Sequence, residues 1–296
     1  MELKKPMTIK EQLAKMKAHG MAIENEEEAT RILSEINYYR LTGYVLQHRK
    51  EADKSEYVSG LTFNTMCQIY AFDEAIRDIL RKYVEKVEIY YRTLISHSFS
   101  IAKCVPPPHD QHYDEANFFN KTGYAEVMDS FQKERNYYKD SLIVKHHKQK
   151  YGNKMPLWVI VELISFSNVS KLYNAMYLSE KQQIADVVGV GTKKLENHLH
   201  CLAVLRNKCA HAARLYNTEF NPPAQFTKQF LKKHPEIRNN TLFAYVLVLL
   251  KHLPDPAMKA QLASDISIVL DKFAEDIDLA LIGFPQDYQN FLNQHL

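Results

Sequence analysis

One short segment of the sequence, Leu205–His211, combines residue types that can break a phosphodiester bond. Arg206 and His211 are separated by four residues, and Asn207 directly follows the arginine. Arginine holds phosphate through a permanently charged, fork-shaped set of donors, and histidine transfers protons near neutral pH. Together, phosphate binding and proton transfer are the least that cleavage of an RNA phosphodiester without a metal ion requires.

The spacing of this pair is not distinctive by itself, because Arg92 and His97 repeat it. On a straight helix five residues advance about 500°, which leaves Arg206 and His211 roughly 140° apart. Both side chains reach a common space if the helix ends or bends nearby. Alternatively, each lies at the rim of an interface and a second copy of the chain completes the site. The plainer alternative is a surface ion pair for Arg206 and a structural role for His211.

The elements that must position these residues are all predicted to be helices. Apolar residues recur at helical spacing along most of the chain, only 8 residues are glycine, and no stretch alternates like a strand. The motif falls in a predicted helix over 195–216, closed by Pro222 and Pro223. We expect a long helix over 62–101 to contain a bend or break, and a helix from Pro156 to continue through Phe166. The remaining predicted helices cover residues 9–19, 26–36, 125–138, 242–253 and 262–279.

Bulk composition sets looser limits on function. The net charge of +3 neither requires nor excludes a nucleic-acid partner, since a local basic patch matters more than the total. The four cysteines are dispersed without a CxxC pair, which is typical of reduced thiols. The first residues contain no signal-like apolar stretch, and the longest apolar run, 242–250, is far short of a membrane span. We therefore expect a soluble, cytoplasmic protein.

Several blocks of the sequence, in order, resemble the Abi-like (Abi-D/Abi-F) family of bacterial abortive-infection proteins, which lies within the HEPN superfamily. The block over 36–44, INYYRLTGY, is similar to that family's INYYRLSGY-like segment, and LRNKCAH over 205–211 corresponds to its LRNxxAH signature. The chain departs from the family pattern at Ser167-Asn168, at His198 and at Tyr216. The other matching blocks are Lys5-Pro6, the stretches over 71–73 and 87–93, and a P-x-W-x-x-x-E-x-x-S-F pattern over 156–166.

This resemblance implies a fold and an activity. The fold is an HEPN-like helical bundle over 61–222, with an N-terminal helical segment over 1–60 and a C-terminal extension over 223–296. The activity is that of a metal-independent, toxin-like endoribonuclease without a cofactor. His211 acts as general acid or base, Arg206 holds the scissile phosphate, and Asn207 orients one of them. Active centres of this type are usually shared across a homodimer. The family also implies a restraining partner, either a structured noncoding RNA or a protein antitoxin.

Further candidate residues concern RNA binding and the second Arg–His pair. RNA recognition combines basic residues with aromatic planes, and two stretches qualify. The alternatives for them are a solvated helix face and a packed aromatic corner. Arg92 is more typical of a structural couple with Glu88, four residues earlier, than of a second catalytic pair with His97. The candidate RNA-binding residues are Lys139, Lys145, His146, His147, Lys148 and Lys150 in the first stretch, and Tyr39 and Arg40 in the second.

Two other readings of the sequence remain open. Five histidines and cysteines crowd the predicted motif helix, but side chains spread around one helix do not converge on a zinc ion, so no metal site is predicted. A catalytically silent helical RNA-binding module is the alternative to a nuclease. Nothing in the sequence indicates a membrane partner or specificity for DNA.

Overall fold

The structure is a computed structural model that describes residues 3–51, 55–152 and 154–294. Over these residues the chain forms fourteen α-helices and no strand beyond two isolated backbone bridges, Ala22 with Thr62 and Arg49 with Tyr57. The predicted all-α class is confirmed. None of the helices in the described ranges combines the length and the apolar character needed to cross a lipid bilayer.

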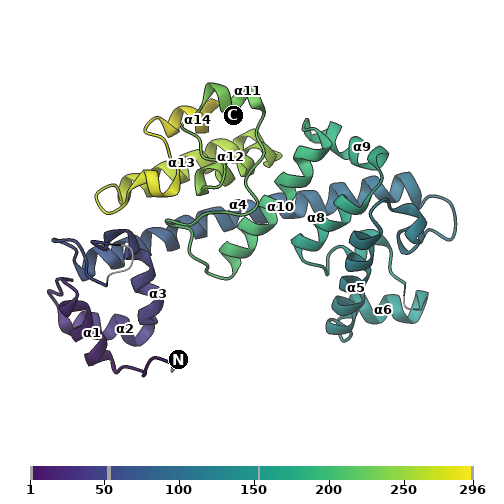
Figure 1. Cartoon of the computed structure of the whole chain (residues 1–296). Helices are drawn as coiled ribbons and strands as arrows, with labels where there is room; N and C mark the ends of the chain where they lie inside the picture. Colours follow the sequence, from purple (N-terminus) through teal and green to yellow (C-terminus); the bar gives the residue numbers. More distant parts are fainter. Residues whose placement is uncertain (1–2, 52–54, 153, 295–296) are drawn as a thin grey trace.

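Helix α4 (Phe63–Lys103) runs through the middle of the molecule (Figure 1). It is one continuous helix of 41 residues, about 60 Å long at a rise of 1.5 Å per residue. The predicted break inside this stretch is wrong. The helix stays continuous because different elements cover its apolar stripe in turn along its length. These are α3 and η1 near its start, then α13, α10 and α12, and finally α7, α8 and α9.

The N-terminal segment forms a small helical unit beside the start of α4 (Figure 1). Its first two helices begin with the predicted caps. The Thr8 amide donates to the Glu11 carboxylate at 2.7 Å, completing a capping box, and the Asn25 side chain accepts from the Glu28 amide at 3.0 Å. The aromatic block folds into a short α-helix that continues as a 3-10 helix. The elements are α1 (Ile9–Ala18), α2 (Glu26–Glu35), α3 (Tyr38–Thr42) and η1 (Gly43–His48).

A group of shorter helices surrounds the other end of α4 (Figure 1). The helix predicted to run from Pro156 through Phe166 is interrupted, and that prediction is wrong. It ends at Ile160, and the Ser165 side chain then caps a new helix by accepting from the Asn168 amide at 3.3 Å. The elements are η2 (Gln111–Tyr113), η3 (Glu115–Asn117), α5 (Lys121–Tyr137), α6 (Leu142–Tyr151), α7 (Leu157–Ile160), α8 (Phe166–Ala175) and α9 (Leu178–Val188).

Helix α10 (Thr192–Ala210), which carries the motif, packs against α4, α8, α9 and α12. Helix α12 is buried on nearly all its faces and forms the centre of the C-terminal segment. Buried apolar residues of all three predicted segments belong to one cluster, while their division into domains stays a prediction. The C-terminal elements are α11 (Lys228–Lys233), α12 (Leu242–His252), α13 (Pro256–Lys272), η4 (Leu279–Ile282) and α14 (Tyr288–Gln294).

A chain of buried hydrogen bonds joins α4, α12 and α10. The Tyr91 hydroxyl lies 2.5 Å from His252 Nδ1, His252 Nε2 lies 2.8 Å from His198 Nδ1, and His198 Nε2 lies 2.8 Å from the Gln225 carbonyl. Because that carbonyl only accepts, each group donates to the next when both histidines are neutral. Burial accordingly lowers the pKa of His198 to about 4 and holds the pKa of His252 well below its ordinary value.

Candidate active site

The motif occupies the last turns of α10, and the helix ends within it. The prediction that this helix continues to Tyr216 is wrong, because the chain leaves the helix after Ala210. Ala212 adopts a left-handed φ of 50°, and the Ala213 amide donates back to the Lys208 carbonyl at 2.9 Å. This is the Schellman pattern, which satisfies carbonyls at a helix end. His211 is therefore the C-cap residue, and it lies at the point where the chain turns away.

The His211 side chain is exposed and has no hydrogen bond or ion pair to any of the described residues. By contrast, Cys209 two positions earlier is buried, and burial raises the pKa of its thiol to about 12. Lys208 is partly buried, with its ammonium 5.1 Å from the centre of the Phe220 ring, and burial lowers its pKa. Of these three titratable side chains, His211 is the one that faces solvent freely.

Arg206 is held by a buried carboxylate of α4. Its Nε donates to Glu88 Oε2 at 2.8 Å, and the other oxygen of Glu88 accepts from Arg92 at 2.5 Å. About a third of the Arg206 side chain is exposed, whereas that of Glu88 is 7% exposed. The two terminal amino groups of Arg206 make no hydrogen bond to the described residues. One carboxylate between two guanidinium groups leaves one net positive charge, so this arrangement presents an oriented cation to an anion.

Glu88 belongs to the site through its contact with Arg206, which the sequence did not predict. The couple of Glu88 with Arg92 was predicted from their spacing, and this ion pair is present. Arg92 is buried and also donates to the Val161 carbonyl, while His97 is exposed. The structure therefore does not bring Arg92 and His97 together as it does Arg92 and Glu88. The link from Glu88 to Arg206 spans 118 positions and has no local signal.

The Asn207 side chain points to α8. Its amide donates to the Ser167 hydroxyl at 3.1 Å, and no hydrogen bond joins its side chain to Arg206 or His211 among the described residues. The backbone carbonyl of Asn207 accepts from the His211 amide at 3.0 Å. Ser167 is one of the positions named above where the sequence departs from the pattern it resembles.

A second buried carboxylate fixes the chain immediately after the motif. Asp73 of α4 is fully buried and accepts from the amides of Leu215 and Tyr216 at 2.9 and 2.7 Å. Its other oxygen accepts from the Tyr44 hydroxyl at 2.7 Å and is paired with Arg77. The aromatic block, α4 and the segment after His211 therefore meet at one carboxylate.

The aromatic block also contacts this segment directly. Arg40 donates to the Ala212 carbonyl, next to His211, and Arg214 donates to the Gly43 carbonyl. Arg40 also lies 5.6 Å from the centre of the Tyr70 ring. The Tyr39 ring is 84% exposed. Of the two predicted RNA-binding stretches, this one adjoins the motif.

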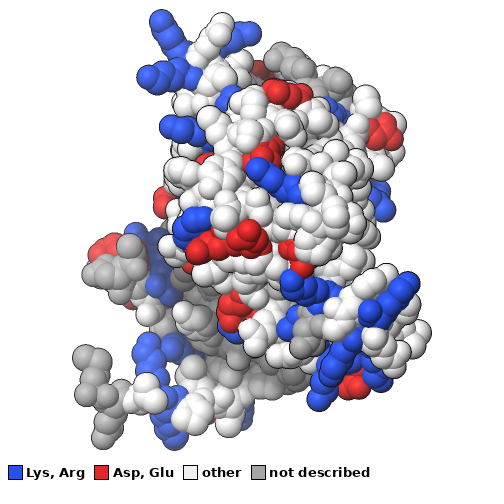
Figure 2. All heavy atoms as spheres, turned by 90° about the vertical axis from the view of Figure 1, so that its right-hand side faces the viewer, with Lys and Arg blue, Asp and Glu red and all other residues white. Residues whose placement is uncertain are grey.

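The other predicted RNA-binding stretch lies at the far end of α4 from the aromatic block (Figure 1). Lys139 follows α5, and the remaining residues belong to α6, where most side chains are exposed. Figure 2 shows the molecule from this end, and Lys and Arg side chains are numerous on the lower half of the face that it shows. Lys145 is paired with Asp140 at 3.3 Å, and His147 Nδ1 lies 2.8 Å from the Ile143 carbonyl. Lys148 and Lys139 line a small hollow of 50 Å³, while His146 and Lys150 face solvent.

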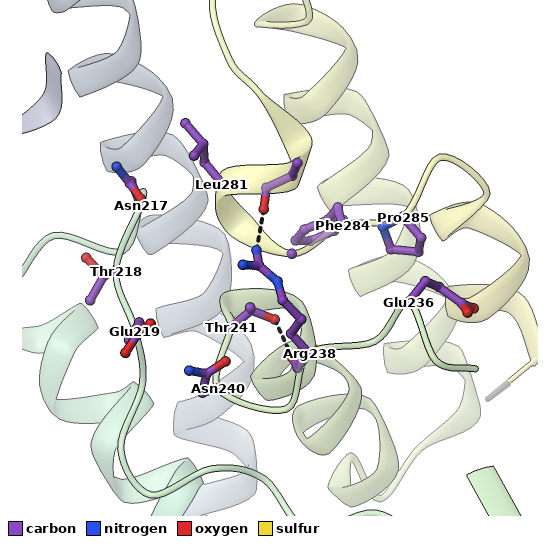
Figure 3. A pocket seen from close by; sticks show the side chains of 12 residues that line it. Asn217, Thr218, Glu219, Glu236, Arg238, Asn240, Thr241, Leu281, Phe284 and Pro285 are labelled. Carbon is purple, nitrogen blue, oxygen red and sulfur yellow. Dashed lines mark hydrogen bonds between the residues drawn. The ribbon is translucent and has the colours of Figure 1, made fainter. Parts of the chain in front are cut away.

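A hollow of 410 Å³ that no sequence motif marked lies just beyond Tyr216. Figure 3 shows Asn217, Thr218 and Glu219 on one side of it and Arg238 reaching across toward the Ala280 carbonyl, to which it donates at 2.5 Å. Its lining comes from three segments that are distant in sequence, which explains why the sequence did not reveal it.

Metal-ligating side chains do not cluster in the described residues: no three of His, Cys, Asp and Glu lie so as to hold an ion. His198, one of the residues that crowd α10, is used in the buried hydrogen-bond chain with His252.

Comparison with known proteins gives one match. The family model of the Abi-like proteins matches residues 31–217, a span that holds the aromatic block, Asp73, Glu88 and the motif. Searches of the curated proteins and of the solved structures found no match. Because the matched span covers more than half of the sequence, the chain belongs to the family of Abi-like proteins.

Proposed function

We propose that this protein is a metal-independent endoribonuclease of the HEPN type that acts in abortive infection. Membership of the Abi-like family points to abortive infection in general terms. The observation that carries the nuclease proposal is that the last turns of α10 hold two side chains of suitable chemistry in different ways. Arg206 is oriented by the buried Glu88, and its terminal amino groups make no hydrogen bond within the described part of the chain, while His211 is exposed at the helix end.

These two side chains suit transesterification of RNA. A ribose 2′-OH attacks the adjacent phosphorus, so that a 2′-O–P bond forms and the P–O5′ bond breaks. The 2′-OH proton passes to a base, and the leaving 5′ oxygen takes a proton from an acid. His211 supplies one of these proton transfers. The terminal amino groups of Arg206 stabilise the charge that develops on the phosphate oxygens.

One histidine cannot serve as base and acid in the same step, which supports a site built from two chains. A homodimer in which two α10 ends face each other supplies a second His211 and a second Arg206. The exposure of His211, at the tip rather than the buried side of α10, is compatible with such an approach.

The test uses purified protein, single-stranded RNA and EDTA. We expect cleavage products with 2′,3′-cyclic phosphate and 5′-hydroxyl ends. Arg206→Ala and His211→Ala should each lower the rate by about 100-fold or more. Matched controls are Arg81→Ala, which removes an exposed arginine of α4, and His97→Ala, which removes an exposed histidine and tests the second Arg–His pair. Normal cleavage by both motif variants would refute the assignment.

The same preparation tests the partners. Light scattering reports whether the chain is a dimer, and sequencing of co-purified nucleic acid reports a bound RNA. A wild-type protein that never cleaves but retains one defined RNA would favour the silent RNA-binding module. Cleavage that begins only when such an RNA is removed would identify it as the restraining partner.

A further inference from the structure

A hollow of 890 Å³ lies in the N-terminal segment, next to the end of α10. Its walls come from α1, α3, η1 and the segment that follows His211. Five of the lining residues are lysine or arginine, and none of the described lining residues is Asp or Glu. We name this hollow the N-terminal groove. The lining comprises Lys4, Lys15, His19, Asn37, Tyr38, Tyr39, Arg40, Thr42, Gly43, Tyr44, Leu46, Arg49, Ser55, Tyr57 and Arg214.

The charge of the groove is not neutralised from within. Arg40 and Arg214 donate to backbone carbonyls, which carry no net charge, and none of the five cations has an ion pair among the described residues. The pKa of His19 is lowered, first by burial and then by the positive charges of Lys15 and Arg49, with Glu56 acting weakly in the opposite sense.

Arg49 has a donor without an acceptor. Its Nε is buried and makes no hydrogen bond to any residue that the structure describes, although a buried N–H without a partner costs free energy. A phosphate oxygen is the acceptor that an arginine Nε and its neighbouring amino group bind best. Tyrosine rings stand beside these cations, and that of Tyr39 is 84% exposed. Exposed aromatic planes next to basic side chains are the features that single-stranded RNA requires.

From these observations we propose that the N-terminal groove binds the backbone of a single-stranded RNA and leads that strand to His211. This inference rests on the proposed nuclease function for its direction, since the groove adjoins His211 through the bond between Arg40 and the Ala212 carbonyl. Arg49 and Lys15 contact phosphates, and Tyr39 stacks on a base. The lysines of α6 lie at the other end of α4 and take no part in this path.

The experiment measures binding separately from cleavage. All variants are made in the His211→Ala chain, and fluorescence anisotropy follows a labelled single-stranded oligonucleotide at several salt concentrations. Each lost phosphate contact on a single strand lowers the slope of log K against log salt by about 0.7. We expect Lys15→Gln/Arg49→Gln to weaken binding by about tenfold or more at low salt and to reduce this slope by about 1.4. Tyr39→Ala should weaken binding by about 5- to 150-fold, with no change of slope.

A matched control removes equal charge elsewhere. Lys232→Gln/Lys233→Gln affects two exposed lysines of α11 that lie outside the groove. Thermal unfolding by circular dichroism shows that each variant is folded before binding is compared. The inference is overturned if the wild-type groove binds no single-stranded RNA, or if the groove variant behaves like the control variant.

Two further arms separate the possible outcomes. If the wild-type protein never cleaves RNA but the groove variant loses binding, the result supports the RNA-binding groove and refutes the nuclease function. Cleavage by the wild type, combined with undiminished binding by the groove variant, refutes the groove and leaves the nuclease. A folded hairpin RNA is measured in parallel. Loss confined to the hairpin would overturn the proposed substrate path and assign the groove to a structured RNA partner.

Discussion

Replacing Asp73 by Asn should destabilise the whole chain, although the substitution only exchanges one carboxylate oxygen for an amino group. The carboxylate is fully buried and accepts four hydrogen bonds, from Leu215, Tyr216, Tyr44 and Arg77. Asparagine keeps one accepting oxygen but places an amide group against the guanidinium of Arg77, which then remains buried without a counter-charge. Breaking a buried pair in this way costs about 3–5 kcal/mol.

This cost converts into a measurable shift of melting temperature. For a chain of this length the entropy of unfolding is about 0.6 kcal/mol/K, so the melting temperature should fall by roughly 5–8 °C. Circular dichroism at 222 nm measures it, and urea titration checks the free energy of unfolding. The control Asp129→Asn removes an exposed carboxylate paired with Lys133 and should cost under about 0.5 kcal/mol.

A double variant separates charge from packing. Asp73→Asn/Arg77→Met removes the unpaired charge, so it should be more stable than Asp73→Asn alone. The reasoning is refuted if Asp73→Asn shifts the melting temperature no more than Asp129→Asn does.

Three other predictions follow from single contacts. Glu88→Gln should lower kcat by up to about 100-fold with little change in KM, because Arg206 loses its fixed orientation. The assay is run below the melting temperature of the variant, and an unchanged kcat would contradict this role of Glu88. His198 should contribute a loss of stability of about 3 kcal/mol between pH 6.5 and 4, because the unfolded chain binds a proton that neutral His198 does not; His252, whose pKa is also lowered, adds to this loss, so urea titrations of His198→Phe should show a smaller loss than the wild type. Ala212→Gly should raise stability by about 0.5–1 kcal/mol by removing the left-handed strain, and an unchanged melting temperature would argue against it.

The sequence predicted those helix boundaries that local chemistry determines. The capping box of Thr8 and the cap of Asn25 depend on residues three positions apart, and both are present in the structure. The end of α10 was missed because Ala210, Ala212 and Ala213 favour helix and no glycine or proline comes before Pro222. The chain leaves the helix there under contacts from distant segments, from Arg40 to the Ala212 carbonyl and from Asp73 to two later amides.

In the candidate site, too, local features could be predicted from the sequence and long-range contacts could not. Arg206 and His211 could be selected from residue type, spacing and the surrounding blocks. Their supporting contacts could not, since Glu88 lies 118 positions from Arg206 and Ser167 lies 40 positions from Asn207. The groove joins residues from Lys4 to Arg214, so only the folded chain reveals that they form one surface.

The unbroken course of α4 sets a rule for which insertions the chain tolerates. Asp73 and Glu88 lie 15 positions apart on this helix, about 22 Å, and they anchor the segment after His211 and Arg206 respectively. One residue added between them turns the two carboxylates by 100° relative to each other, so at most one keeps its partner. Two added residues are no better, since they turn the carboxylates by 200°. The number of residues between Asp73 and Glu88 on helix α4 therefore cannot change without loss of one of the two anchoring contacts.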